Sequence, residues 1–230
     1  MLPIFPAHLF NPGAVAADIV LDAITGGTSL VGVQDVIQAD GGGRWQIAYD
    51  SIILDEKPLE RLWKAWTAEI AGGSQPFLVP LLSVDTGPRP IAGRAFAAPS
   101  DICADDDTFP TEVRFSAPYI IASISAPVAM RATTMQITVQ QGTAVQPGMM
   151  FSVGVWAYKI RRIRSRNGLS AVVDTIVPAR APIAAGTPAN FDWPCVVCRA
   201  VPGQDLVASV EAGQVATTSI QFVEDTTYVG

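Results

Sequence analysis

The stretch RWQIAYDSIILDEKPLERLWKAWTAEIAGG, residues 44–73, contains a strand pattern that is followed directly by a helix pattern. In residues 44–54 the apolar side chains of Trp45, Ile47 and Tyr49 alternate with others, which is typical of a half-buried β-strand. Over about residues 56–71 the large apolar residues instead recur three or four positions apart, as on one face of an α-helix. The stretch therefore predicts a strand that leads into one amphipathic helix.

The predicted helix has recognisable ends and one apolar face. Asp55 is placed to cap its start, Pro58 is tolerated in the first turn, and Gly72-Gly73 end it. Its two tryptophans could form a ligand platform, but they share their face with leucines, which favours a place in the core. We expect these residues and Trp45 to be structural: Leu59, Leu62, Trp63, Trp66 and Ile70.

The composition indicates a β-rich globular protein. The 230 residues are 49% hydrophobic, which is enough to bury one large core or two small ones. The 19 glycines and 18 prolines are spread between short apolar runs, as in many strands joined by turns. We expect a mainly-β fold.

Charge and histidine content argue against several classes of function. The net charge of −6 would repel nucleic acid, so any basic contact must come from a local patch. The N-terminus shows no signal-peptide pattern, and no apolar run reaches the roughly 18 residues of a membrane-spanning helix. His8 is the one histidine, which leaves little for histidine-dependent catalysis. We therefore expect no catalytic constellation, no cofactor, no metal and no membrane partner.

Residues 125–203 contain a series of short strand patterns that would suit a small β-barrel. About five strand patterns occur there, and Asn167-Gly168 between two of them is a strong signal for a tight hairpin. The last strand pattern, Ser219 to Glu224, needs a partner sheet and is expected to return to the first block. The predicted organisation is a β-sandwich of residues 1–124 and 204–230 with the flanking helix, and an inserted barrel over 125–203.

A run of basic residues lies on the predicted hairpin. Strand alternation would direct Lys159 and Arg161 to one face, and Arg162, Arg164 and Arg166 to the other. Charge on both faces indicates an edge strand or a projecting hairpin. These residues would either contact an acidic partner or passing nucleic acid, or form a solvated tip that discourages edge-to-edge aggregation.

Two other patterns suggest chemistry and have simpler interpretations. Cys195 and Cys198 form a C-x-x-C in a strand pattern, where they would face opposite ways about 10 Å apart, beyond the ~7 Å that a disulfide allows. With Cys103 they make three cysteines, which we expect to be free thiols. Gly41-Gly42-Gly43 precedes a strand instead of a helix, so a phosphate-cradling loop is not expected.

Acidic residues leave a carboxylate-only enzyme as the least favoured alternative. Glycoside hydrolysis by two carboxylates needs no histidine. The candidates cluster around the helix start, where they also suit capping and the helix dipole: Asp50, Asp55, Glu56 and Glu60. The run Asp105–Asp107 lacks the spacing of an EF-hand and is interpreted as a solvated acidic turn.

The order of these features resembles the distal tail proteins of tailed, siphovirus-like bacteriophages and of gene transfer agents. The resemblance covers roughly residues 40–225. It is carried by Trp45, by the segment LERLWKAWTAEIAGGSQPFLVPL, by the QPGMMFSVGVWAYKIRRI strand pair with its Gly148, Phe151 and Tyr158, and by the closing SIQFVED. Residues 1–40 match no feature of the family.

The resemblance implies a fold and a role. The fold would be a tail-tube-like β-sandwich with one flanking helix plus a small barrel of oligonucleotide/oligosaccharide-binding (OB) type, with Phe151 and Tyr158 as structural residues. The role would be a virion structural protein in a ring, usually of six, between the tail tube and the hub of the tail tip or baseplate, with DNA only in transit. The alternative is a receptor- or carbohydrate-binding module of the tail tip.

Overall fold

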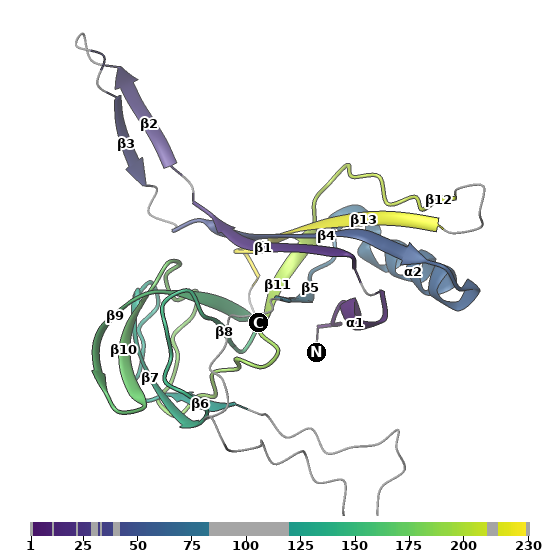
Figure 1. Cartoon of the computed structure of the whole chain (residues 1–230). Helices are drawn as coiled ribbons and strands as arrows, with labels where there is room; N and C mark the ends of the chain where they lie inside the picture. Colours follow the sequence, from purple (N-terminus) through teal and green to yellow (C-terminus); the bar gives the residue numbers. More distant parts are fainter. Residues whose placement is uncertain are drawn as a thin grey trace, which may run out of the picture.

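A computed structural model describes residues 2–10, 12–21, 23–28, 32, 34–38, 42–82, 120–210 and 216–228. Within these residues the fold is mainly β, as expected, with two curled antiparallel sheets and a separate two-stranded hairpin (Figure 1). The described helices are α1 (Ala7–Phe10), α2 (Lys57–Ile70) and the 3₁₀ turn η1 (Ala71–Gly73).

The larger sheet has six strands and contains the predicted strand of residues 44–54 with the bounds expected. Its order is β1-β4-β13-β11-β5, with β12 paired to β13. The bounds are β1 (Ala14–Val20), β4 (Arg44–Leu54), β5 (Phe77–Pro80), β11 (Cys195–Ala200), β12 (Ser209–Val210) and β13 (Ala216–Glu224). The predicted return of the last strand to the first block is confirmed, because β13 pairs with β4.

Helix α2 packs on this sheet with the face that the sequence predicted. Trp63 and Ile70 are buried, and Leu59, Leu62 and Trp66 pack against the same core as Trp45. The helix ends at Ile70 and passes into the 3₁₀ turn that contains both glycines, and a Cβ on Gly73 would lie 2.4 Å from the Ala200 carbonyl oxygen. Only glycine allows that close approach of the backbone to the end of β11.

The N-terminal segment completes this core, although the sequence contained no feature that assigned it. Phe5 is fully buried, and its ring lies 5.1–6.5 Å from five other aromatic rings, those of Phe10, Tyr49, Trp66, Phe77 and Phe222. The Phe5 amide donates to the Leu78 carbonyl, and the Leu78 amide donates to that of Pro3. Residues 3–5 thus cover the edge of β5.

The second sheet forms a small barrel. Its order is β6-β7-β10-β9-β8, with β6 (Ile121–Ile124), β7 (Thr134–Gln141), β8 (Met150–Val153), β9 (Trp156–Asn167) and β10 (Ser170–Thr175). Residues 187–190 bridge the two edge strands, through Ser123–Pro188 on β6 and Ser152–Asn190 on β8. We call β6–β10 with this closing segment the small barrel. Phe151 and Tyr158 are buried in its core.

The tight turn predicted from Asn167-Gly168 is present, displaced by one residue along the chain. Asn167 pairs with Ser170, so Gly168 and Leu169 form the two-residue loop, and Gly168 has a φ of +58°. A two-residue hairpin turn with a positive φ at its first position favours glycine there.

Strands β6 and β11 do not belong to the sheets that the predicted domain boundaries assigned to them. β6 lies within the range assigned to the first block but pairs with β7, whereas β11 lies within 125–203 but pairs with β5 and β13. Strand β11 lies between the two cores and is buried on both faces. Val196 and Cys198 belong to the core of the larger sheet, and Val197 belongs to the barrel core. The expected boundaries near 124 and 203 therefore do not coincide with the sheet boundaries.

Candidate functional site: an arginine pocket between barrel and sheet

A cavity of about 720 Å³ lies where the small barrel meets the larger sheet. The barrel side contributes β9, β10, the turn before β7 and the loop after β10. Gly42, just before β4, and Thr226, just after β13, come from the side of the larger sheet. Its charged lining is five arginines against one aspartate, and we call it the arginine pocket: Arg131, Arg161, Arg162, Arg164, Arg180 and Asp174.

Asp174 on β10 organises two of the arginines. Arg162 Nε donates to its Oδ2 at 2.5 Å, Arg164 Nε donates to its Oδ1 at 2.7 Å, and Thr134 Oγ1 donates at 2.9 Å. Burial by itself would raise the pKa of Asp174, but the hydrogen bonds from Arg162, Thr134 and Arg164 outweigh it and lower the pKa. The buried carboxylate therefore stays ionised and holds both guanidinium groups.

Irregular pairing between β9 and β10 brings three arginines to one place. The register shifts between Val172 and Val173 and again between Asp174 and Thr175, so that Arg164 and Arg161 are each an extra residue on β9. A β-bulge of this kind re-aims side chains. The prediction that Arg161 faces away from Arg162 and Arg164 was therefore wrong, since all three line the pocket.

Arg131 lines the pocket from a turn whose backbone conformation favours glycine. Its φ is +68°, and the Ala132 amide donates to the Ala129 carbonyl oxygen across the turn. Glycine is the residue that this backbone conformation favours. An arginine with a strained backbone beside a charged pocket is the kind of outlier that suggests a role for its side chain.

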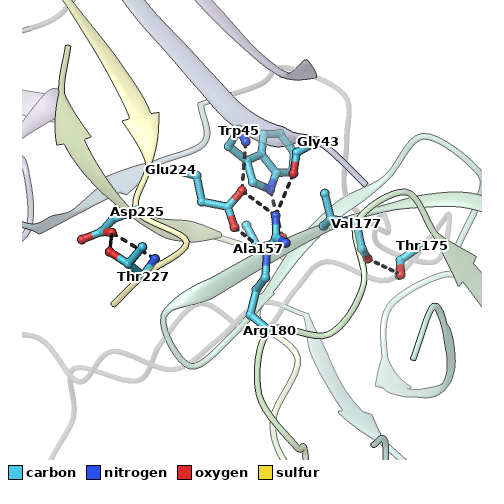
Figure 2. Close-up of polar contacts among 9 residues, drawn as sticks. All are labelled: Gly43, Trp45, Ala157, Thr175, Val177, Arg180, Glu224, Asp225 and Thr227. Carbon is cyan, nitrogen blue, oxygen red and sulfur yellow. Dashed lines mark hydrogen bonds and ion pairs between the residues drawn. The ribbon is translucent and has the colours of Figure 1, made fainter. Parts of the chain in front are cut away.

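Arg180 joins the pocket to the contact between the two sheets (Figure 2). Its Nε donates to Glu224 Oε1 at 3.0 Å, and its Nη2 donates to the Gly43 carbonyl at 2.7 Å. Glu224 also accepts the Trp45 amide at 3.0 Å, and the Trp45 indole donates to the Ala157 carbonyl at 2.9 Å. These bonds connect β4 and β13 to the barrel and so position one wall of the pocket.

Three of the five basic residues singled out in the sequence line the pocket, and two do not. Lys159 pairs with Asp18 of β1 at 2.8 Å, which is a second link between barrel and sheet. Arg166 donates to the Val145 carbonyl near the hairpin tip. Among the described residues only β10 pairs with β9 beyond Ile160, so this half of the hairpin is an edge, as expected.

Sequence reasoning missed Arg131, Arg180 and Asp174. Asp174 is the one charged residue in the strand pattern of residues 170–177, and a carboxylate that is buried in such a strand needs a basic partner. That was a usable signal. Arg131 and Arg180 are 49 positions apart in sequence and had no pattern that linked them.

The other candidate groups do not assemble into a site in the described part of the chain. Cys195 and Cys198 are free and buried in β11, and burial raises the pKa of both thiols, to about 11 for Cys195. Among the described residues, no group of three or more His, Cys, Asp or Glu side chains is arranged so that it could hold a metal ion. Glu60 pairs with Lys64 on the surface of α2, at 2.6 Å. Cys103 and Asp105–Asp107 lie outside the described residues.

Gly42 lines the arginine pocket and has a φ of +68°, and a Cβ there would lie 2.7 Å from Pro178 Cδ. The glycine thus permits close packing of the strand start on the barrel loop. It precedes β4 and not a helix, in agreement with the sequence pattern.

No protein-family model matches the chain, and no curated protein matches it. The helices in the described part of the chain are too short or too polar to cross a membrane.

Proposed function

We propose that this chain is a structural virion protein of a phage tail tip, which assembles with copies of itself into a ring of six between the tail tube and the hub. The residues that carry the resemblance to distal tail proteins support this. Trp45, Trp63, Phe151 and Tyr158 are buried in the two cores, and Trp66 packs against one of them. The protein would act without catalysis or cofactor, and DNA would only pass through the ring.

The observation that carries the proposal is the hairpin of β2 (Ala23–Thr28) and β3 (Gln34–Gln38). These strands pair with each other and with no other described strand, and Figure 1 shows them projecting beyond both sheets. They continue the antiparallel pair of β1 and β4, whose last partners are Val20 and Arg44. An isolated two-stranded hairpin is marginally stable in water, which favours a partner that covers it.

The base of the hairpin also offers a surface for contact. Val20 is 44% exposed and Leu21 is 51% exposed, and β1 is an edge strand of the six-stranded sheet. An exposed edge with apolar side chains is a template for another strand. In a ring, a neighbouring copy would cover both features.

Assembly can be tested by mass photometry and negative-stain imaging of the purified chain. We expect closed rings, and loss of rings when residues 23–38 are replaced by an Asn-Gly turn that joins β1 to β4. The matched control is Val207→Glu, which changes a 79% exposed apolar residue far along the chain and should leave the rings intact. A monomer at every concentration, with or without the hairpin, would contradict the proposal.

The arginine pocket favours the second candidate, a binding module of the tail tip. In that case the chain would be monomeric and would bind a ligand of the host surface, whereas the first candidate requires rings. The same images therefore separate the two.

A further inference from the structure

We propose that the arginine pocket binds a small molecule that carries phosphate groups, with the charge of a diphosphate. This inference does not depend on assembly into a ring. It rests on the pocket's size, on its excess of positive charge and on the way in which its arginines are held.

Four of the arginines in the pocket have N–H groups that donate to no other group in the described part of the chain. Arg162 and Arg164 each use Nε on Asp174, and both side chains line the cavity while still 66% and 52% exposed. In the described part of the chain, no hydrogen bond or ion pair is formed by the side chain of Arg131 or Arg161. A guanidinium group has five N–H donors, so most of the donors on these four arginines have no acceptor in the described part of the chain.

The arrangement is made before any ligand arrives. Asp174 is 5% exposed and pins Arg162 and Arg164 on its two oxygens, so little side-chain freedom is lost when they bind an anion. The register shifts of β9 and the left-handed backbone of Arg131 add two further guanidinium groups to the same cavity. A fold that needed only a solvated surface would gain nothing from the strain at Arg131.

The chemistry of the lining favours phosphate. A phosphate monoester offers three terminal oxygens and nearly two negative charges, and so can accept from several guanidinium groups at once, whereas a carboxylate offers two oxygens and one charge. The volume of about 720 Å³ exceeds that of one phosphate and lies within the range of small-molecule sites. The arginines converge on a cavity instead of forming a line along the surface, which favours a small ligand over a nucleic-acid backbone.

Inorganic pyrophosphate is the probe for a first test by isothermal titration calorimetry, at low salt and at about 0.15 M salt. We expect saturable one-site binding that weakens at the higher salt. Arg131→Gly and Arg161→Gln should each weaken it about 10-fold or more. Glycine suits the backbone of residue 131, and Arg161 is exposed, so both variants should fold as the parent does, which thermal unfolding checks.

Arg61→Gln is the matched control, because it removes an exposed arginine on α2 outside the pocket. Unchanged pyrophosphate affinity in this variant supports the proposal. Absence of binding, or equal weakening by Arg61→Gln, would overturn it. The proposal would also be overturned if a single-stranded oligonucleotide or a triglutamate peptide bound more tightly than pyrophosphate and if Arg131→Gly and Arg161→Gln abolished that binding. The ligand would then be a nucleic acid or an acidic protein segment.

Discussion

Arg180 and Glu224 form a buried ion pair between the small barrel and the six-stranded sheet. Arg180 Nε lies 3.0 Å from Glu224 Oε1, and the two side chains are 14% and 1% exposed. The same arginine donates to the Gly43 carbonyl, and the same glutamate accepts the Trp45 amide (Figure 2). The orientation of the barrel on the sheet thus depends on an ion pair that is largely shielded from water.

Removal of one partner should be costly. Arg180→Ala leaves the Glu224 carboxylate buried without its main partner, and we expect the free energy of unfolding to fall by about 3–5 kcal/mol in urea denaturation. Lys64→Ala is the control, because it breaks the exposed Glu60–Lys64 pair and should leave stability essentially unchanged. Equal effects of the two substitutions would show that the buried pair does not hold the sheets together.

The indole of Trp45 should contribute separately to this junction. Trp45→Phe leaves the Ala157 carbonyl without the indole donor and removes part of a fully buried ring. We therefore expect the free energy of unfolding, measured by urea denaturation, to fall by about 1–3 kcal/mol. Trp193 is 41% exposed, and Trp193→Phe should have little effect. A larger loss for Trp193→Phe would mean that the junction is not packed as described.

Acid should weaken the contacts of Asp174. Its pKa is lowered in the folded state from 3.8, so the stabilisation is fully present above pH 3.8 and is lost as the pH falls through the lower, folded-state pKa. We expect Asp174→Asn to be less stable than the parent at neutral pH, with a difference that narrows below pH 3.8. Denaturation midpoints of both proteins across this pH range measure the difference. A constant gap at all pH values would exclude the ionised carboxylate as its source.

The two cysteines of β11 should be inert in the folded protein. Both are buried and their thiol pKa values are raised, so few thiolates are present near neutral pH. With iodoacetamide at pH 8, peptide mass mapping should find Cys195 and Cys198 unmodified in the native protein and fully alkylated in urea. An exposed cysteine introduced as Val207→Cys should react in both states. Rapid native labelling of Cys198, or a disulfide between the two residues, would contradict the structure.

Local sequence patterns predicted the elements whose form depends on neighbours in the chain. Three elements appear as expected: the strand of residues 44–54, the helix with its apolar face of Leu59, Trp63 and Ile70, and the hairpin that turns at Gly168. Cys195 and Cys198 were expected to face opposite ways along their strand, and the alternation on which this rests is present, because Val197 and Cys198 lie in different cores. Each depends on a period or a turn preference that a few consecutive residues carry.

The site depended on contacts that no local pattern contains. Arg162 faces the same cavity as Arg161 because β9 shifts its register against β10, and a shift of that kind is set by the partner strand. Strand β11 lies in the larger sheet because both of its faces are covered by apolar residues from distant segments. Sequence alone therefore determined that this is a mainly-β chain with one amphipathic helix and a basic hairpin. Only the tertiary structure decided that three arginines of the hairpin meet Arg131, Arg180 and Asp174 in one pocket, because side chains far apart in sequence are brought together by long-range pairing.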